Sequence, residues 1–230
     1  MQIGNSPLGE ARAQREGNSC PVTREQLKQA LLERYSPWMY EKISSGSVAI
    51  AGLGGLGSQI AVMLARAGVG KLFLVDFDKV ELTNLNRQAY HIGHLGRPKT
   101  EALAEILAQI NPYVETEART EKVTEENAAA LFRGYPILCE GFDRPEQKAM
   151  LVNTVLAQCA GTIVISGSGM AGYGPANQIV TERKMGRLYL CGDGRTKLDA
   201  GTCLMAPRVM ACAAHQANAA IRLLLGEEEV

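Results

Sequence analysis

The stretch VAIAGLGGLG, residues 48–57, joins a short apolar run to a glycine-rich loop. The run is typical of a buried strand, and the apolar-faced segment QIAVMLARAG (59–68) after the glycines is typical of a helix. A second apolar run, KLFLVDF, occupies 71–77. Strand, helix and strand in this order form a β-α-β unit with a right-handed crossover and parallel strands. This segment therefore predicts an α/β fold.

The alternation of strand and helix continues through the chain. The apolar patterns predict helices over 100–110, 125–134 and 145–160, strands over 113–119, 137–142 and 162–167, two further strands at 177–183 and 187–191, and a long helix at 207–225. The two late strands are predicted to be antiparallel to each other. We therefore expect a Rossmann-like doubly wound sheet, mostly parallel, with an antiparallel extension and an N-terminal helical segment.

The N-terminal part of the chain divides into two segments. Residues 1–20 are polar, with too few apolar groups to offset the entropy of ordering, so we expect a mobile tail. Thr23 and Gln26 have the spacing of a capping box, which predicts that a helix begins there. Pro37 is expected to end or kink it. Residues 21–230 are then expected to form a single domain.

Composition excludes several classes of protein. Lys+Arg and Asp+Glu are balanced at 24 each, so there is no global field to attract nucleic acid or an anionic membrane. The six cysteines form no C-x-x-C pair, and a chain of 230 residues needs no disulfide staples. No segment resembles a signal peptide or reaches membrane-spanning length. We expect a soluble cytoplasmic protein with reduced thiols that binds no membrane and no nucleic acid.

The glycine loop indicates a nucleotide. Gly52, Gly54 and Gly57 satisfy G-x-G-x-x-G between a predicted strand and helix, and Asp76 ends the next predicted strand. Such glycines let the backbone approach a phosphate at a helix N-terminus, and the acid accepts ribose hydroxyls. The alternative is that the glycines only make a tight turn. Nicotinamide-dependent oxidoreductases use the same fingerprint, so the loop does not identify the nucleotide.

A polar segment after Asp76 argues against a nicotinamide-dependent dehydrogenase. Such an enzyme needs one acid at this position and then a helix. The segment DFDKVELTNLNRQ (76–88) is typical of an active-site loop. Its candidate nucleotide-binding side chains are Asp78, Asn84, Asn86, Arg87 and Gln88.

Two cations and one acid complete the candidate site. The planar Arg87 and the compact Lys99 suit a triphosphate attacked at its α-phosphorus. Asp143 follows a predicted strand at the position where doubly wound sheets bind ligands, and it is a candidate ligand for Mg²⁺. The alternative places both cations on a solvated face and makes Asp143 the cap of the helix near Pro145.

These motifs resemble the ThiF/MoeB/E1-like superfamily of adenylating enzymes. The matching runs are GLGGLG (52–57), DFDKVELTNLNRQ (76–88), the run ending in GRPK at Lys99, INP (110–112), the strand end at Asp143, and LMAPRV (204–209). The resemblance covers about residues 30–225. The segments EGFDRPEQKA, GMAGYGPANQIVTE, YLCGDG and MAPRVMACAAHQAN look most like the compact bacterial branch called ThiF family 2, which is assigned to thiamine thiazole biosynthesis.

The resemblance implies roles for the candidate residues. Gly55 would bind the nucleotide phosphates through its N–H, and Asp76 would take the ribose. Asn84, Asn86 and Arg87 would surround the phosphates. Lys99 would stabilise developing charge, and Asp143 would coordinate Mg²⁺.

The resemblance also implies a substrate, which is the C-terminal Gly-Gly carboxylate of a small ubiquitin-like sulfur carrier such as ThiS. The carboxylate attacks the α-phosphate of ATP and gives an acyl-adenylate and pyrophosphate. A carboxylate is already ionised at pH 7, so this step requires no general base. The glycine-rich SGSGMAGYG (166–174) leaves room for a thin diglycine tail, and a plain loop explains these glycines as well.

The chain departs from the family pattern at three places. The two C-x-x-C pairs that hold structural zinc in many relatives are absent, so we expect no such zinc. Lys197 stands where some relatives carry the cysteine that attacks the adenylate, and Cys191 and Cys203 are nearby substitutes. In MoeB-like dimers an N-terminal arginine reaches the partner's ATP. Here Arg34 is kept, and Pro37 replaces a second arginine.

Rival functions stay open at this point. They are a related enzyme for another carrier or a tRNA substrate, a non-catalytic protein that docks a carrier, and an oxidoreductase. We also expect a homodimer, because the helix at 207–225 carries an apolar surface wider than one stripe, which a two-fold interface would bury. A core contact within one subunit is the competing explanation. The surface comprises Val209, Met210, Cys212, Ala213, Ala217, Ala220, Ile221 and Leu224.

Overall fold

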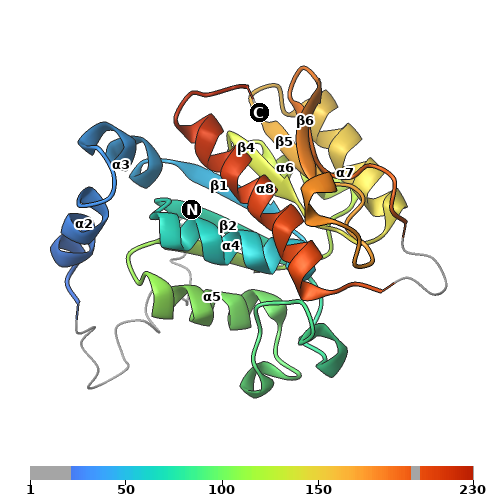
Figure 1. Ribbon diagram of the computed structural model, residues 1–230, viewed down its shortest axis with the longest axis horizontal. Helices are drawn as coiled ribbons and strands as arrows, with labels where there is room; N and C mark the ends of the chain where they lie inside the picture. The colour runs from blue at the N-terminus through green and yellow to red at the C-terminus, as the bar shows by residue number, and fades with distance from the viewer. Residues whose placement is uncertain (1–21, 198–202, 230) are drawn as a thin grey trace, which may run out of the picture.

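A seven-stranded sheet forms the centre of the molecule (Figure 1). The computed structural model describes residues 22–197 and 203–229, so the tail expected at 1–20 lies outside the described residues. The strand order is β3-β2-β1-β4-β5-β7-β6. The strands are β1 (Ser47–Ala51), β2 (Lys71–Asp76), β3 (Glu115–Thr120), β4 (Ile137–Glu140), β5 (Ile163–Gly167), β6 (Val180–Met185) and β7 (Leu188–Gly192).

Strand pairing confirms the predicted α/β Rossmann-like class. Every neighbouring pair is parallel except β6 and β7, which form the predicted antiparallel extension. The chain runs outward from β1 to β2 and β3 on one side, and from β4 to β5 on the other. Sheets of this kind bind ligands where the strand order reverses, outside the carboxyl ends of the strands. The crevice beyond β1, β2 and β4 is therefore the place to look for a site.

Helices cover both faces of the sheet. Side chains of α4, α5 and α8 form one core with Ile50 and Leu72, and side chains of α6 and α7 form a second core with Phe73 and Leu138 on the other face. The helices are α2 (Arg24–Leu32), α3 (Pro37–Ser44), α4 (Gly55–Ala67), α5 (Lys99–Ile110), α6 (Glu125–Phe132), α7 (Pro145–Gln158) and α8 (Ala206–Leu224). Three short 3-10 helices are η1 (Leu82–Asn84), η2 (Ile92–His94) and η3 (Ala176–Gln178).

Several predicted boundaries move. Thr23 caps α2 through the expected capping box with Gln26, but the helix already ends at Leu32. Pro37 does not end that helix; it is the first residue of α3, behind the N-cap Ser36, where its missing N–H costs nothing. The prediction for Pro37 is therefore wrong.

Two further boundaries differ at the sheet. Helix α4 begins within the glycine loop, at Gly55, because glycine does not prevent a helical first turn. Strand β4 ends at Glu140, so Asp143 lies in the connection to α7 and not at a strand end.

The apolar surface of α8 is largely used within one subunit. Val209, Cys212, Ala213, Ala217 and Ala220 are all buried, and α8 packs against α4 and the sheet. Of the eight residues in the predicted surface, Met210 is the one that keeps 40% of its side chain exposed. This burial favours the competing explanation, a core contact within the subunit. The expected homodimer stays a prediction.

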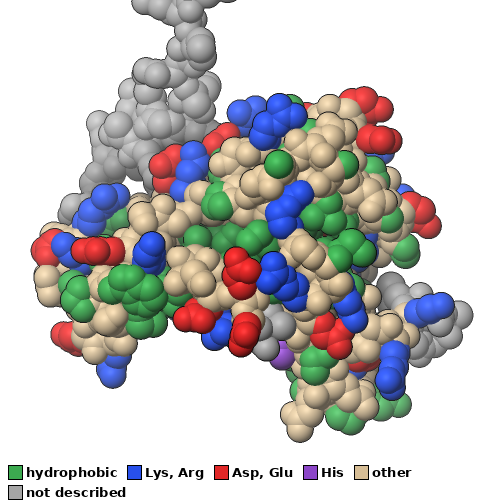
Figure 2. Space-filling model, turned by 90° about the horizontal axis from the view of Figure 1, so that it is seen from above, with side chains coloured by type: hydrophobic (Ala, Val, Ile, Leu, Met, Phe, Trp, Pro, Cys, Tyr) green, Lys and Arg blue, Asp and Glu red, His purple; other side chains and the backbone are tan. Residues whose placement is uncertain are grey.

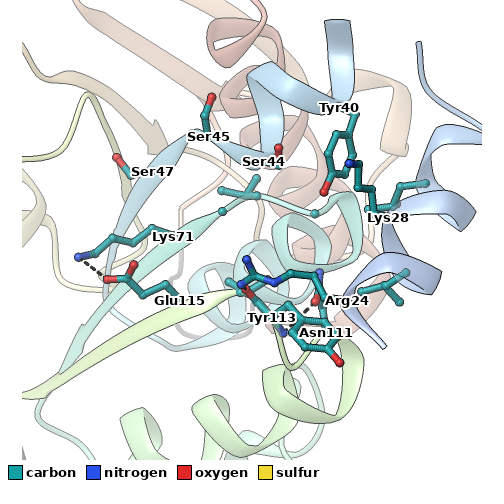
Figure 3. Close-up of a pocket in the computed structure, with 17 residues that line it drawn as sticks. Arg24, Lys28, Tyr40, Ser44, Ser45, Ser47, Lys71, Asn111, Tyr113 and Glu115 are labelled. Atoms are coloured by element: carbon teal, nitrogen blue, oxygen red, sulfur yellow. Dashed lines mark hydrogen bonds and ion pairs between the residues drawn. The ribbon is translucent and has the colours of Figure 1, made fainter. Parts of the chain in front are cut away.

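A cavity of about 430 Å³ lies at the amino-terminal edge of the sheet (Figure 3). Helices α3, α4 and α5 all end at its wall. Arg24 lies over the ring of Tyr113 and Lys28 over that of Tyr40, while Lys71 forms an ion pair with Glu115 at 2.8 Å. Helix C-termini carry partial negative charge, which nearby cations stabilise. The three cations therefore have partners in the cavity wall, beside helix ends whose partial negative charge favours them.

The surface carries charges of both signs. On the face in Figure 2, Lys and Arg side chains are interspersed with Asp and Glu, as the balance of 24 and 24 in the sequence leads one to expect. Across residues 22–197 and 203–229, no helix combines the length and the apolar character that crossing a bilayer requires.

Candidate active site

The glycine loop connects β1 to α4 at the carboxyl edge of the sheet. Gly52 has a φ of +83°, and a Cβ at Gly57 would lie 1.9 Å from the Gly52 carbonyl oxygen, so the turn itself requires both glycines. Gly54 is the N-cap of α4, and a Cβ there would meet only the Gln88 amide nitrogen, at 3.8 Å. Open space at a helix N-terminus suits an anion. Gly54 thus faces a candidate phosphate site, whereas Gly52 and Gly57 shape the turn.

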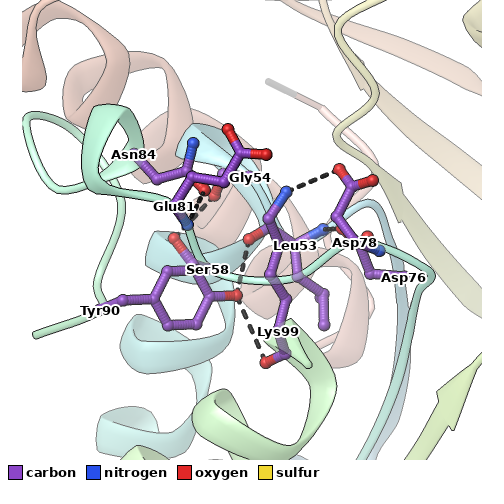
Figure 4. Close-up of polar contacts among 9 residues, drawn as sticks. All are labelled: Leu53, Gly54, Ser58, Asp76, Asp78, Glu81, Asn84, Tyr90 and Lys99. Carbon is purple, nitrogen blue, oxygen red and sulfur yellow. Dashed lines mark hydrogen bonds and ion pairs between the residues drawn. The ribbon is translucent and has the colours of Figure 1, made fainter. Parts of the chain in front are cut away.

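Asp76 lies beneath this loop, buried to 7% exposure (Figure 4). One carboxylate oxygen accepts the backbone N–H of Leu53 at 2.6 Å, and the other accepts that of Asp78 at 2.7 Å. Burial raises the pKa of Asp76, and the Lys99 charge and the two N–H donors oppose this shift. Each oxygen keeps a second lone pair for a ribose hydroxyl. Asp76 therefore holds the loop in place, a contact that the sequence analysis did not predict.

The polar segment docks onto the glycine loop through two side chains that the sequence analysis missed. Ser58 donates to the Gly54 carbonyl at 2.7 Å and accepts the Ala89 N–H at 3.1 Å. The Tyr90 hydroxyl donates to the Leu53 carbonyl at 2.8 Å (Figure 4). Neither residue belongs to a motif with a fixed spacing. Only their positions could have indicated these contacts. Ser58 lies in the first turn of α4, and Tyr90 follows the polar segment.

Two of the predicted amide side chains are buried. The Asn84 oxygen accepts the Glu81 N–H at 3.1 Å, so Asn84 stabilises the turn of η1. Gln88 lies next to Gly54, and its side-chain oxygen has no hydrogen-bond partner among the described residues. Buried polar atoms are rarely left unpaired in folded proteins, so an unpaired amide beside the glycine loop is consistent with a ligand there.

Arg87 crosses the first turn of α4. Its Cγ lies 3.4 Å from the position that a Cβ at Gly55 would take. Its guanidinium donates to the Thr83 carbonyl at 3.1 Å and to the Asn86 side-chain oxygen at 2.8 Å. The structure therefore brings Arg87 to the helix N-terminus where phosphates are expected, and holds it there.

Lys99 begins α5 and is 6% exposed. Its ammonium group forms an ion pair with Asp78 at 2.8 Å, and the Lys99 N–H donates to the Asp78 carbonyl at 3.0 Å. The alternative of a solvated surface lysine is therefore wrong. Because Asp78 neutralises it, Lys99 acts as one half of a pair at the site.

Asp143 is exposed and lies three residues beyond β4. It is not the cap of α7, since the N-cap is Arg144, which makes no side-chain capping bond. The segment around it rests on the glycine loop: Gly141 donates to the Ala51 carbonyl at 2.8 Å, and the Phe142 ring lies 2.7 Å from the position of a Cβ at Gly52. Within the described ranges, no three His, Cys, Asp or Glu side chains form a group able to hold a metal ion.

A model of the ThiF family matches residues 27–230. The chain belongs to the ThiF family. The resemblance that the sequence motifs predicted is thereby confirmed.

The ThiF-family relatives differ in length and in name. Molybdopterin-synthase adenylyltransferase of Haemophilus influenzae is 40% identical over 112 residues, 48% of this chain and 46% of that protein. Adenylyltransferase and sulfurtransferase UBA4 of Yarrowia lipolytica is 30% identical over 192 residues, 80% of this chain and 47% of that protein. Ubiquitin-like modifier-activating enzyme 5 of Arabidopsis thaliana is 48% identical over 85 residues, 37% of this chain and 20% of that protein. The chain thus spans about half or less of the length of these relatives.

Solved structures agree on the fold of this ThiF-family chain. The tRNA N6-threonylcarbamoyladenosine dehydratase of E. coli, solved in complex with ATP, superposes with a TM-score of 0.79. The alignment covers 89% of this chain and 97% of that one, at 20% sequence identity. Likeness at this identity establishes a shared architecture.

Two buried clusters lie in runs that the sequence analysis matched to the family, EGFDRPEQKA, YLCGDG and LMAPRV, without assigning a role to their charged residues. In the first, Glu140 is fully buried and accepts from Lys148 at 2.6 Å, from Ser166 at 2.5 Å and from the Phe142 N–H at 2.6 Å. Lys148 also donates to the Phe142 carbonyl at 3.2 Å. This cluster fixes the turn that precedes Asp143.

The second cluster joins α8 to the loop after β5. Arg208, 4% exposed, donates to the carbonyls of Gly174 and Pro175 at 2.7 and 2.8 Å and forms an ion pair with Asp193 at 2.5 Å. Burial acts to raise the pKa of Asp193, but hydrogen bonds from Thr196, Arg195 and Arg208 outweigh it and lower the pKa to about 2. The carboxylate therefore stays charged and holds the loop.

The candidate thiols differ in environment. Cys191 lies in β7, fully buried beside Thr181, and burial raises its pKa to about 11. A thiol of this kind is a poor nucleophile at neutral pH. Cys203 is exposed, as is Lys197, and residues 198–202 between them lie outside the described part. Arg34 is exposed in the connection between α2 and α3.

Proposed function

We propose that this protein adenylylates the C-terminal Gly-Gly carboxylate of a small ubiquitin-like carrier at the expense of ATP. The observation that carries the proposal is the placement of Arg87 over the first turn of α4, next to the open N-cap at Gly54. A carboxylate nucleophile is already ionised and requires charge stabilisation instead of a general base. The names of the sequence relatives, several of them adenylyltransferases, support the same reaction class.

Each residue of the proposed site would contact a different part of ATP. Asp76 would accept the ribose hydroxyls, while the N–H groups at the start of α4 would receive phosphate oxygens. In the chemical step a carrier carboxylate oxygen forms a bond to the α-phosphorus, and the bond from that phosphorus to the bridging oxygen breaks. Pyrophosphate leaves with the electron pair. Arg87 and the Lys99–Asp78 pair would stabilise the charge that moves onto it.

Asp143 fits a role in holding Mg²⁺. This ion is usually bound by one or two carboxylates together with substrate phosphates, so one exposed carboxylate beside the glycine loop is a suitable ligand set. When bound, Mg²⁺ would neutralise charge on the leaving phosphates. The Glu140 cluster would keep the Asp143 segment in place.

A ThiS-like sulfur carrier of thiamine thiazole biosynthesis is the substrate that we propose. The glycine-rich 166–174 segment is compatible with a thin diglycine tail, and Arg208 anchors this segment through Gly174. A tRNA substrate is the alternative suggested by the name of the structural neighbour from E. coli. The overall balance of 24 Lys and Arg against 24 Asp and Glu favours a protein, because it gives no net positive field to attract RNA.

ATP–pyrophosphate exchange tests the proposal. Purified protein is incubated with ATP, Mg²⁺ and labelled pyrophosphate, with or without ThiS-like and MoaD-like carriers. We expect exchange only with a carrier ending in Gly-Gly, and none with the matched carrier that lacks its last glycine. The proposal fails if every diglycine carrier is inert. Exchange with the MoaD-like carrier alone would keep the reaction and replace the substrate.

We propose in addition that the protein works as a homodimer. Because α8 is largely covered within the subunit, the interface is expected at other apolar residues. Leu82 and Ile92, which are 71% and 76% exposed, are suitable. Light scattering at micromolar concentration checks the mass, with a Leu82→Lys variant as the disrupted form. A monomeric wild-type protein contradicts the proposal.

A further inference from the structure

The side chain of Asn86 connects two parts of the molecule. Its oxygen accepts the Arg87 guanidinium N–H at 2.8 Å, and its amide nitrogen donates to the Leu204 carbonyl at 3.0 Å. Asn86 and Leu204 are 118 residues apart in sequence. One carboxamide thus contacts both the candidate phosphate-binding arginine and the segment that leads into α8.

The segment at Leu204 is itself joined to the glycine-rich loop after β5. Gly172 donates its N–H to the Cys203 carbonyl at 2.7 Å, and Gly172 and Leu204 form a parallel β-bridge. No atom lies within 4 Å of the position that a Cβ at Gly172 would take. The loop is therefore open beside this bridge.

These contacts form a continuous series from the loop to the arginine. Gly172 holds the segment at Cys203 and Leu204, that segment holds the Asn86 amide nitrogen, and the Asn86 oxygen holds Arg87. The other acceptor of Arg87, the Thr83 carbonyl, belongs to its own turn and does not reach across the site. Asn86 thus gives Arg87 a direct hydrogen-bonded link to the segment at Leu204, in addition to the packing of α8 on α4.

We propose that Asn86 is a positioning residue that fixes Arg87 relative to the glycine-rich loop at 167–174. This inference rests on the proposed function and assigns Asn86 a place different from direct phosphate contact. In this proposal the carrier tail lies along the open loop. Asn86 fixes the position of that loop relative to Arg87. The carrier carboxylate and the guanidinium are then aligned for the same phosphorus, and alignment of this kind governs rate.

Two substitutions separate the two bonds of Asn86. Asn86→Asp keeps an acceptor for Arg87 but removes the donor to Leu204, whose carbonyl then faces a carboxylate. Asn86→Ala removes both bonds. For Asn86→Asp we expect the carrier KM to rise about tenfold with the Tm unchanged, the scale of one lost hydrogen bond. For Asn86→Ala we expect kcat to fall about tenfold in addition, because Arg87 loses its Asn86 acceptor and keeps the Thr83 carbonyl alone.

The control is Asn153→Asp, an exposed residue of α7 far along the chain from the site. Unchanged carrier KM and kcat in both Asn86 variants overturn the proposal. A fall in Tm that accompanies the change in carrier KM in both Asn86 variants also overturns it, because a general loss of folding explains both.

Amide hydrogen exchange gives a readout that does not depend on turnover. We expect faster exchange in residues 203–209 of Asn86→Asp than in wild type or Asn153→Asp. If wild type is inactive with every carrier, the proposed function fails while faster exchange still supports the connection. Identical exchange in all three proteins refutes the connection itself.

Discussion

The two edges of the central sheet carry opposite helix ends. At the carboxyl edge α4, α5 and α7 begin, and acids such as Asp76 and Asp78 lie beside them. At the amino edge α3, α4 and α5 end, and Arg24, Lys28 and Lys71 line a cavity of about 430 Å³. Helix N-termini attract anions and helix C-termini attract cations. Helix C-termini disfavour an anion in the cavity at the amino edge, whereas the helix N-termini of the carboxyl edge favour one, so we place the proposed chemistry at the carboxyl edge.

Alanine substitution of one glycine at each edge should give the largest difference between the two edges. A Cβ at Gly57 would lie 1.9 Å from the Gly52 carbonyl oxygen, and a Cβ at Gly70 would lie 2.0 Å from that of Ser44. We expect Gly57→Ala and Gly70→Ala to lower the free energy of unfolding by similar amounts. Only Gly57→Ala should abolish ATP binding, measured by calorimetry on folded protein, because only its turn shapes the phosphate site.

Thermal unfolding of both variants is the control for this pair. If Gly70→Ala loses ATP binding as completely as Gly57→Ala while remaining folded, the assignment of nucleotide to the carboxyl edge is wrong.

Removal of one cation at each edge should change the adenylylation rate only at the carboxyl edge. We expect Arg87→Ala to slow single-turnover adenylylation on the order of 10²-fold at saturating ATP, the scale of one lost transition-state contact. Lys28→Ala should leave the rate unchanged, because Lys28 contacts Tyr40 at the opposite edge. A wild-type rate for Arg87→Ala would remove this residue from the active site.

Much of the carboxyl edge was predictable because its signals are local in sequence. Strand, glycines, helix and Asp76 follow one another within thirty or so residues, and each has a known spacing. The antiparallel pair β6 and β7 was visible for the same reason, as two apolar runs with a short turn. The mistake at Pro37 arose because proline both ends helices and begins them, and Ser36 was the overlooked cap.

The contacts within the buried clusters were not predictable, although the runs that carry their residues were noted, because these contacts depend on the packing of distant elements. Glu140 meets Ser166 across 26 residues, and Arg208 meets Asp193 across 15. No periodicity relates such residues, which meet only once the strands are paired. The neutralisation of Lys99 by Asp78 across 21 residues escaped for the same reason.

The ribose contact gives a smaller effect at the same edge. We expect Asp76→Ala to weaken ATP binding about tenfold and to change the chemical step less, because the ribose is held equally in ground and transition states. Equilibrium titration with ATP, set beside single-turnover rates, measures the two separately. An unchanged Kd would show that Asp76 serves only to hold the Leu53 and Asp78 N–H groups.

The smallest expected difference concerns two ion pairs, Arg208–Asp193 near the carboxyl edge and Lys71–Glu115 at the amino edge. Asp193→Asn should cost about 1 kcal/mol of unfolding free energy at pH 7, because it weakens buried charge-assisted hydrogen bonds. Glu115→Gln, whose side chain is 69% exposed, should cost less than about 0.5 kcal/mol.

The cost of Asp193→Asn should depend on pH. The pKa of Asp193 in the folded protein, about 2, lies below its ordinary value, so its contribution is complete above that ordinary value. The contribution is lost as the pH falls toward 2. Denaturant unfolding at several pH values should show the wild type and Asp193→Asn converging in acid. A constant difference would contradict the assignment.

The packing of α8 on α4 also sets an order of events during synthesis. Helix α4 leaves the ribosome early, whereas α8 follows every strand of the sheet. At typical elongation rates, the apolar side of α4 is synthesised on the order of ten seconds before α8. During that interval the nascent chain exposes an apolar surface that is buried in the folded protein. Chaperone engagement is therefore expected on ribosome-bound chains that carry α4 and lack α8.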